Sequence, residues 1–307
     1  MRMGGGPGGP GGPGGPGGPG GGRLRGSAAP GMQPGQGMFN FSLTHTWRVQ
    51  DEVVIRDGLA PLNLLDGDSI SGSGGLAKSG NGVLTLTGTH TFTGATAITG
   101  GQLRLNGSAA SSAFTVSGGI FSGSATVGAL TIASGGTLSP GNSPGTTTSL
   151  ENNTWAGGGT FTFEINNATG TAGTHWDLLA ITGSLTITAT SGSKFTVGIN
   201  TLDFSNAAGV PVNFSAGSNY TFAFVTTTGG VIGFDPGKFT LTTTGVDSSL
   251  TGTWNIAQSG TNLNLLYSGN AIPEPSTAAA ILGACALALA AWKRRNARLQ
   301  PPSSREA

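Results

Sequence analysis

The sequence is short of charge: only 9% of its 307 residues are Asp, Glu, Lys or Arg, against about 25% in soluble globular proteins. It also lacks helical patterns of about 10–15 residues between its apolar stretches. A soluble helical bundle needs charged faces and strong helix formers, so that class is excluded, as are βαβ units. The net charge of +1 provides no attraction to nucleic acid, and we expect no nucleic-acid partner.

Residues that bind metals are scarce. Cys285 is the only cysteine, which excludes an intrachain disulfide and a zinc site built on thiolates. His90 and His175 have no cysteine nearby, and we interpret each as a polar turn residue. Asp66-Gly67-Asp68-Ser69 lacks the further ligands of a calcium loop and is interpreted as a turn. We therefore predict no metal and no cofactor.

Glycine, by contrast, is abundant, with 57 residues. Apolar and polar residues alternate in short segments such as 82–88 and 101–107, which end at Gly, Asn or Ser about every 8–12 residues. Short strands with glycine-rich corners are typical of a parallel β-helix, in which successive coils stack and bury a thin apolar column. The composition therefore predicts an all-β protein, and the spacing of the strands alone does not separate a solenoid from a sandwich.

The chain divides into regions by composition. Longer alternating strands are predicted after residue 158, at 160–165, 184–190, 194–200, 219–226, 238–243 and 262–267. They favour an antiparallel region that caps the open end of the solenoid. The predicted regions are a disordered Gly/Pro-rich segment (1–40), an N-terminal β cap or irregular lead-in (41–75), the β-helix (76–150), the antiparallel β region (151–270) and a C-terminal tail (271–307).

Two consecutive segments, 76–88 and 91–103, resemble the autotransporter-associated β-strand repeat. That family reads G-x-L-x-L-x-G-x-N-x-Y-x-G and then T-x-I/V-x-x-G-x-L, and here His90 and Phe92 replace the usual Asn and Tyr. Ser134 to Gly145 is similar to the SPGNSPG corner at the end of such repeats. The resemblance covers about residues 70–150 and implies a β-helix of the passenger type.

The tail combines a proline motif, an apolar stretch and a cluster of cations. Ile272-Pro273-Glu274-Pro275 precedes an uncharged stretch from Ala278 to Trp292, and Lys293-Arg294-Arg295 follow it. Counted from Ser276, the stretch has about 17 residues, the short end of what crosses a hydrocarbon core of about 30 Å. This order predicts one C-terminal transmembrane helix with its cations in the cytoplasm.

This tail resembles the PEP-CTERM sorting domain, which implies recognition and cleavage by an exosortase. By that resemblance, Pro273, Glu274 and Pro275 are the recognition residues, and Lys293, Arg294 and Arg295 form the stop-transfer cluster. It also implies an inner-membrane intermediate that is then released to the cell surface or outside the cell. No apolar leader is visible after Arg23-Leu24-Arg25, and we expect an incorrect start site or a frameshift to explain this.

The sequence offers little for catalysis. Glu164 and Asp177 are the best-placed carboxylate pair for acid/base chemistry, although we favour isolated carboxylates in turns or facing solvent. Trp155, Trp176 and Trp254 could stack on sugar rings, but we favour buried packing. We predict no catalytic residue.

These observations favour a non-enzymatic secreted or cell-surface protein with a structural or adhesive role. Its partners would be an exosortase, a membrane through the C-terminal helix, and extracellular polysaccharide bound by a repetitive Thr/Ser/Asn face. Two alternatives stay open: a polysaccharide-active β-helix enzyme with the same tail, and a truncated autotransporter passenger.

Overall fold

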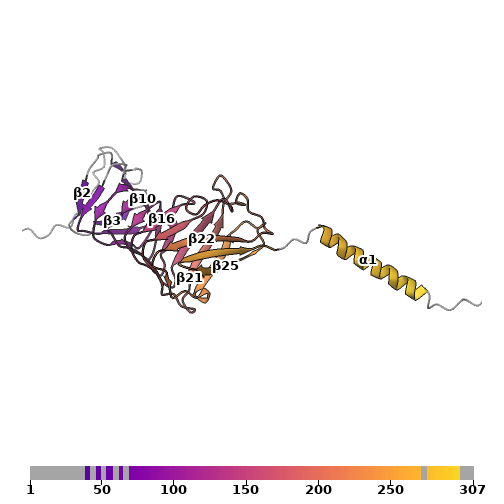
Figure 1. The fold of residues 1–307 in the computed structure, drawn as a ribbon. Coiled ribbons are helices and arrows are strands. Elements are labelled where there is room, and N and C mark those ends of the chain that lie inside the picture. Colours follow the sequence, from indigo (N-terminus) through magenta and orange to yellow (C-terminus); the bar gives the residue numbers. More distant parts are fainter. Residues whose placement is uncertain are drawn as a thin grey trace, which may run out of the picture.

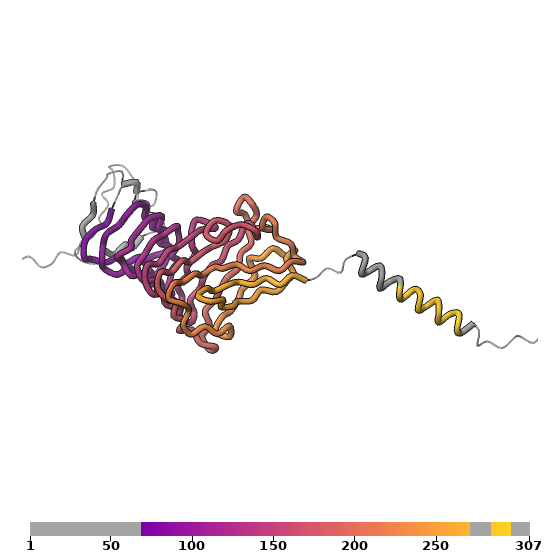
Figure 2. The backbone as a smooth tube through the Cα atoms, in the orientation of Figure 1, coloured from indigo at the N-terminus to yellow at the C-terminus, as the bar shows by residue number. Residues whose placement is uncertain are grey.

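The chain winds repeatedly around one long axis and forms a solenoid of β-strands (Figures 1 and 2). The computed structural model describes residues 39–41, 46–49, 53–57, 62–64, 69–270 and 275–297, with side chains over 69–270 and 284–295. Each coil adds a strand to the faces of the solenoid in turn, and strands of successive coils pair in parallel. The predicted parallel β-helix is thus present, in a protein whose described core is all-β.

The first face is a continuous parallel ladder along the solenoid. Its strands, in order of pairing, are β1 (Phe39–Phe41), β4 (Leu62–Leu64), β7 (Val83–Thr89), β10 (Gln102–Ala109), β12 (Ile120–Gly123), β15 (Thr137–Pro140), β18 (Thr160–Ile165), β21 (Phe195–Thr201) and β24 (Phe239–Gly245).

The second face consists of two ladders: its first strands form a separate sheet, and its later strands belong to the same sheet as the first face. It begins with β2 (Thr46–Val49), β5 (Ser69–Gly72) and β8 (Thr91–Phe92), and continues with β13 (Thr126–Val127), β16 (Thr146–Ser149), β19 (Leu178–Ile181) and β22 (Tyr220–Thr227). The long strand β10 joins the first and second faces, because its beginning pairs with β12 and its last two residues pair with β13.

The third face is a ladder of short strands. They are β3 (Val53–Asp57), β6 (Leu76–Gly80), β9 (Thr96–Ile98), β11 (Phe114–Val116), β14 (Leu130–Ile132), β17 (Asn153–Trp155), β20 (Leu185–Ile187) and β23 (Val231–Ile232).

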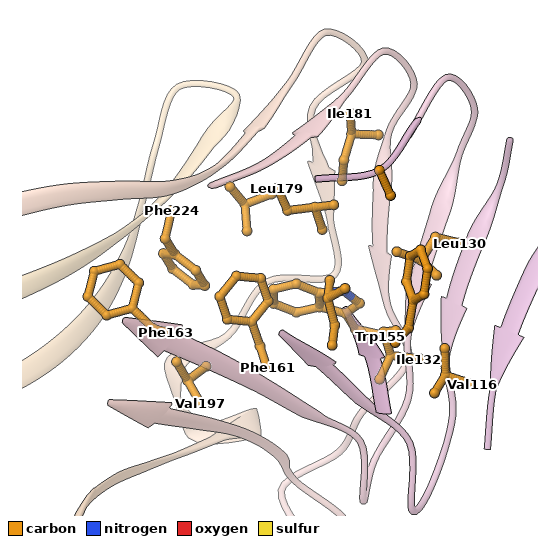
Figure 3. Close-up of a cluster of buried hydrophobic side chains, with 14 of the residues drawn as sticks. Val116, Leu130, Ile132, Trp155, Phe161, Phe163, Leu179, Ile181, Val197 and Phe224 are labelled. Carbon is orange, nitrogen blue, oxygen red and sulfur yellow. The ribbon is translucent and has the colours of Figure 1, made fainter. Parts of the chain in front are cut away.

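The core is a column of apolar side chains to which all three faces contribute. Alternate residues of each strand point inward, as the period of two requires, and the inward residues are buried. Figure 3 shows Trp155 of the third face beside Phe161 of the first. Trp155 stacks on Phe195 of the next coil, with ring centroids 4.4 Å apart and planes at 5°. Aromatic contacts between coils therefore tie the stack together along its axis.

An antiparallel hairpin adds to the C-terminal end of the solenoid. It consists of β25 (Thr253–Ser259) and β26 (Asn262–Ser268), and β26 pairs antiparallel with β22. A short 3₁₀ helix, η1 (Pro236–Lys238), precedes β24. The expected cap is present, but the prediction that 151–270 is antiparallel was wrong, since parallel coils continue to β24. Alternation along a strand has the same period in parallel and antiparallel pairs and does not distinguish them.

The lead-in region also differs from its prediction. Strands β1 to β5 within residues 39–72 pair in parallel with later coils, so this region contains solenoid strands rather than a separate cap. The predicted disordered segment up to residue 38, and the turn residues Asp66 to Asp68, lie outside the described residues.

Helix α1 (Pro275–Ala297) occupies the predicted position of the C-terminal helix. Among the residues that the structure describes, however, no helix has the length and apolar character required to cross a membrane. The C-terminal helix is thus present, but the prediction that it crosses a membrane is not met by its described residues. Its apolar stretch consists largely of alanine, whose side chain is small, and Lys293, Arg294 and Arg295 follow that stretch before the helix ends at Ala297.

Candidate functional site

Threonines form ladders on the outer surface of the solenoid. On the first face, Thr137 aligns with Thr160, Thr160 with Thr196, and Thr196 with Thr240. We call this row the threonine ladder. Neighbouring strands lie about 4.7–4.9 Å apart, so the ladder repeats a hydroxyl and a methyl group at that spacing. A shorter row on the third face contains Thr115, Thr131, Thr154 and Thr186.

A polar groove lies on the first face beside the threonine ladder. Its volume is about 260 Å³, and it is lined by Gln102, Arg104, Ser122, Ser139, Gly141, Asn142, Ser143 and Glu164. The Gln102 amide donates to the Ser122 hydroxyl at 2.7 Å, and this hydrogen bond holds two lining side chains of the groove together. Arg104 is exposed. The groove therefore presents one cation, one carboxylate and several hydroxyl and amide groups to solvent.

The wall of the groove is the SPGNSPG corner between β15 and β16. Gly141 exchanges two backbone hydrogen bonds of 3.0 Å with Gly123 of the previous coil. The Asn142 amide donates to the Asn106 side-chain oxygen at 2.9 Å. At the end of the corner, the Gly145 N–H donates to the Asp177 carboxylate at 2.8 Å. The corner is thus held at both ends.

The predicted acid/base pair, Glu164 and Asp177, is brought together by the structure, but the two residues have different environments. The Glu164 side chain lines the groove. Asp177 is fully buried, and its two oxygens accept the backbone N–H groups of Gly145 and Glu164 at 2.8 and 2.9 Å. Burial raises the pKa of Asp177 well above its ordinary value, and the charge of Glu164 adds to this. Asp177 therefore positions the groove, and its carboxyl group is closed to a substrate.

Both predicted turn histidines take part in backbone hydrogen bonds. His90 is buried, and its Nδ1 accepts the Ile70 N–H of the preceding coil at 3.1 Å. The Nδ1 of His175 accepts the Thr171 N–H at 3.0 Å, within a turn. Within the described residues, no group of three or more His, Cys, Asp or Glu side chains could hold a metal ion.

Of the three tryptophans predicted to be buried, one is fully buried and two are half-buried. Trp155 is fully buried in the core. Trp176 is half-buried and donates its indole N–H to the Ala223 carbonyl at 3.0 Å. Trp254 packs on Tyr267 with ring centroids 5.1 Å apart, yet it also lines a cleft. Packing accounts for the first two, and Trp254 is considered further below.

The predicted sorting residues lie at and beyond the edge of the described structure. Pro273 and Glu274 fall outside the described residues, and Pro275 begins α1 without a described side chain. The predicted stop-transfer residues Lys293, Arg294 and Arg295 lie exposed near the end of α1.

Among the residues that line the groove, only Glu164 was considered from the sequence for a chemical role. Gln102, Ser122 and Ser139 belong to three successive coils, and only the register of the ladder places them together. The available signal was their position just after the glycine corners at 100–101, 118–119 and 135–136. Lys78 was also missed: it is buried and donates to the backbone carbonyls of Ser79, Gly80 and Gly100 at 3.0 to 3.3 Å.

Comparison with known proteins places part of the solenoid in a known repeat class. Residues 76–105 match the passenger-associated-transport-repeat family. The chain is 44% identical over 79 residues to an extracellular serine protease of Serratia marcescens, which covers 26% of this chain and 8% of that protein. It is 33% identical over 129 residues to the adhesin BmaC autotransporter of Brucella suis biovar 1 (strain 1330), which covers 40% of this chain and 4% of that protein.

These relatives are much longer than the aligned segments, so the likeness concerns the repeat and not the whole proteins. Residues 76–105 begin with β6, include β7 to β9, and end within β10. The resemblance to the autotransporter-associated repeat is confirmed for this part of the chain. The match to the passenger-associated-transport repeat therefore covers the solenoid from β6 into β10.

Proposed function

We propose that this chain is a non-enzymatic protein of the cell surface or extracellular space, with an adhesive role, whose first face binds extracellular polysaccharide. The proposal depends mainly on one observation: the threonine ladder and the polar groove lie side by side on a regular parallel sheet. The names of the two relatives, an extracellular protease and an adhesin autotransporter, support a location outside the cell.

The chemistry of the threonine ladder suits a ligand that is itself polar, uncharged and periodic. A row of threonines offers hydroxyl groups that donate and accept hydrogen bonds, and methyl groups that contact apolar C–H surfaces. A single contact of this kind is weak, because water competes for the same hydrogen bonds. Repetition along a polymer raises the overall affinity without any new kind of contact.

A binding measurement with matched variants tests this proposal. The full chain is incubated with insoluble bacterial exopolysaccharide, and the bound fraction is measured. Thr160→Lys and Thr196→Lys place bulky charge in the middle of the threonine ladder and should reduce binding about tenfold together. Thr221→Lys, at an exposed position of β22 on the second face, is the control. Equal binding by the parent, the Thr160→Lys, Thr196→Lys double variant and the Thr221→Lys control would reject the first face as the binding surface.

The same material distinguishes the enzymatic alternative. Release of soluble sugar from the polysaccharide, lost on Glu164→Ala, would favour a polysaccharide-active enzyme. We expect no release, because the Asp177 carboxyl group is buried and bonded to two backbone N–H groups.

We further propose that residues 271–307 are a PEP-CTERM sorting tail, recognised by an exosortase at Pro273, Glu274 and Pro275 and associated with a membrane through α1. The exposed side chains of Leu287, Leu289 and Trp292 support this, since they give the helix apolar surface next to the predicted stop-transfer cluster. An inner-membrane intermediate would precede release.

Mass spectrometry of the protein from cells with and without an exosortase tests the tail. We expect a mature mass that ends near Pro275 only when the exosortase is present, and the full-length mass for a Glu274→Ala, Pro275→Ala variant. A variant that is cleaved like the parent would contradict the assignment of these residues.

A further inference from the structure

A second cleft lies at the C-terminal end of the solenoid. The first face ends at β24 and the hairpin ends at β25, and these two strands stand at opposite ends of one sheet path with no pairing between them. The space between them forms a cleft of about 430 Å³. It is lined by Leu241, Thr243, Val246, Asp247, Ser248, Leu250, Gly252, Thr253 and Trp254. None of these residues belongs to the groove beside the threonine ladder, so the two sites are separate.

Trp254 gives the cleft an aromatic lining, and its ring is held in place by neighbouring rings. Trp254 is half-buried and packs on Tyr267, with ring centroids 5.1 Å apart and planes at 62°. The centroid of its ring also lies 6.1 Å from that of the Phe214 ring. Tyr267 in turn accepts the Gly252 N–H through its hydroxyl at 2.9 Å. The indole ring is therefore a fixed surface, which needs little ordering when a ligand binds.

The cleft also carries a positioned carboxylate. The Asp247 N–H donates to the Thr201 hydroxyl at 2.8 Å, which anchors the loop to β21. Oδ1 of Asp247 accepts the hydroxyl and the N–H of Ser249 at 2.7 and 2.9 Å. These bonds lower the pKa of Asp247, so the group is ionised at neutral pH. Its second oxygen has no hydrogen-bond donor in the described part of the chain.

We propose that this cleft binds one pyranose ring of a neutral glycan, with a C–H face of the sugar on Trp254 and two of its hydroxyls donating to Asp247. An aromatic ring and an ionised acceptor that line the same cleft match a ligand with one apolar face and a ring of hydroxyl donors. The hydroxyls of Thr243 and Ser248 at the rim supply further partners. The cleft volume lies within the range of about 300–1,000 Å³ that is usual for small-molecule sites.

This site would contribute to polysaccharide binding independently of the threonine ladder, because it recognises a single sugar. The test uses the full chain and three probes: the methyl glycosides of α-D-glucose, α-D-galactose and α-D-mannose. Binding is followed by saturation-transfer NMR and by titration. We expect saturable binding of at least one probe.

Two substitutions and one matched control locate the binding. Asp247→Asn removes the charge but retains the oxygen that Ser249 bonds, and Trp254→Leu removes the aromatic surface; each should weaken binding about tenfold. Asp203→Asn is the control, because Asp203 accepts the N–H and hydroxyl of Ser205 in the same manner at an exposed turn but does not line the cleft. Thermal unfolding of Asp247→Asn confirms that the variant is folded.

Several results would overturn the proposal. They are the absence of saturable binding for all three probes, equal binding by Asp247→Asn and the parent, or an equal loss in Asp203→Asn. Displacement of the sugar by a peptide strand that adds to β24 would assign the cleft to a protein partner instead. Sugar binding retained in the Thr160→Lys, Thr196→Lys variant would show that this site stands even if the proposed polysaccharide face fails.

Discussion

The carboxylate of Asp177 accepts the backbone N–H of Gly145 at 2.8 Å, across 32 residues of sequence. Its other oxygen accepts the N–H of Glu164 at 2.9 Å. Gly145 ends the corner that forms the wall of the groove, and Glu164 lines the groove from strand β18. One buried side chain thus fixes the distance between two walls of the candidate site.

The raised pKa of Asp177 makes the stability of the protein depend on pH. Between the ordinary pKa of about 3.9 and its raised value in the fold, the native state binds more protons than the unfolded state. Stability contributed at this site therefore falls as pH rises through that interval. Asp177→Asn has no such titration, although it loses one acceptor and should be less stable by about 1–3 kcal/mol at acid pH.

Thermal unfolding from pH 3 to pH 7 checks this prediction. The melting temperature of the parent should exceed that of Asp177→Asn most at pH 3, and the gap should narrow as pH rises. A gap that stays constant or widens would mean that Asp177 is ionised without penalty in the fold.

Glu164→Gln is expected to stabilise the protein at neutral pH. The charge of Glu164 raises the pKa of Asp177, so its removal eases ionisation of the buried group, while the backbone N–H that Asp177 accepts is retained. We expect a rise in melting temperature of about 1–2 °C at pH 7 and no change at pH 3, where the raised pKa of Asp177 keeps this carboxyl group protonated and uncharged. Glu151→Gln, at an exposed site, is the control, and a similar rise there would indicate a general charge effect.

The stacked pair of Trp155 and Phe195 should dominate the stability of the central coils. Trp155 is fully buried and contacts the rings of Phe161, Phe195 and Phe224. Trp155→Ala removes these contacts and leaves a cavity, for which we expect a loss of about 3–5 kcal/mol in the free energy of unfolding. Denaturant unfolding measures it.

Two further variants separate ring contacts from hydrogen bonding at this position. The indole N–H of Trp155 is buried without an acceptor among the described residues, so Trp155→Phe should cost much less than Trp155→Ala. Phe204→Ala should have little effect, since Phe204 is 86% exposed. Comparable losses for the Ala and Phe variants at position 155 would show that the aromatic stack is not what holds these coils.

The sequence located many strands well but not their partners. The predicted strand at 160–165 coincides with β18, and the strand at 194–200 nearly coincides with β21. These two strands are parallel neighbours, although 29 residues lie between them (166–194). Long connections between strands, such as residues 166–177 between β18 and β19, lengthen the later coils. The strands there no longer recur at the regular intervals in sequence that indicated a solenoid.

The candidate site was less predictable than the fold. Glu164 and Asp177 were identified as the best-placed carboxylate pair, and they do lie together, but burial of Asp177 decides its role and a sequence does not show burial. Gln102 and Asn142 reach the same groove only through the register of stacked coils and the fold of the corner at 140–145. The two ends of the sheet path that enclose the cleft beside Trp254 likewise follow from topology.

Close contact between coils in the repeat requires glycine at position 94. Gly94 lies within the matched repeat, and a Cβ atom there would overlap the backbone of Gly74 and Gly75 in the preceding coil. Gly94 is not among the residues with positive φ, so the obstacle is steric overlap between coils rather than backbone strain. Gly94→Ala should therefore force the coils apart and lower the free energy of unfolding by about 1–3 kcal/mol.

Gly192→Ala is a matched control for this prediction. Gly192 also lacks a positive φ, and the nearest atom to a Cβ there, the Thr190 hydroxyl oxygen, is 4.0 Å away. Its replacement should be neutral or should stabilise the protein by about 0.4–1 kcal/mol, because alanine restricts the unfolded chain. The two variants are compared by thermal unfolding under the same conditions. The two variants differ mainly in whether backbone lies close to the added methyl group. Equal melting temperatures would therefore mean that the coils separate at Gly94 without cost, and would contradict tight stacking of the coils there.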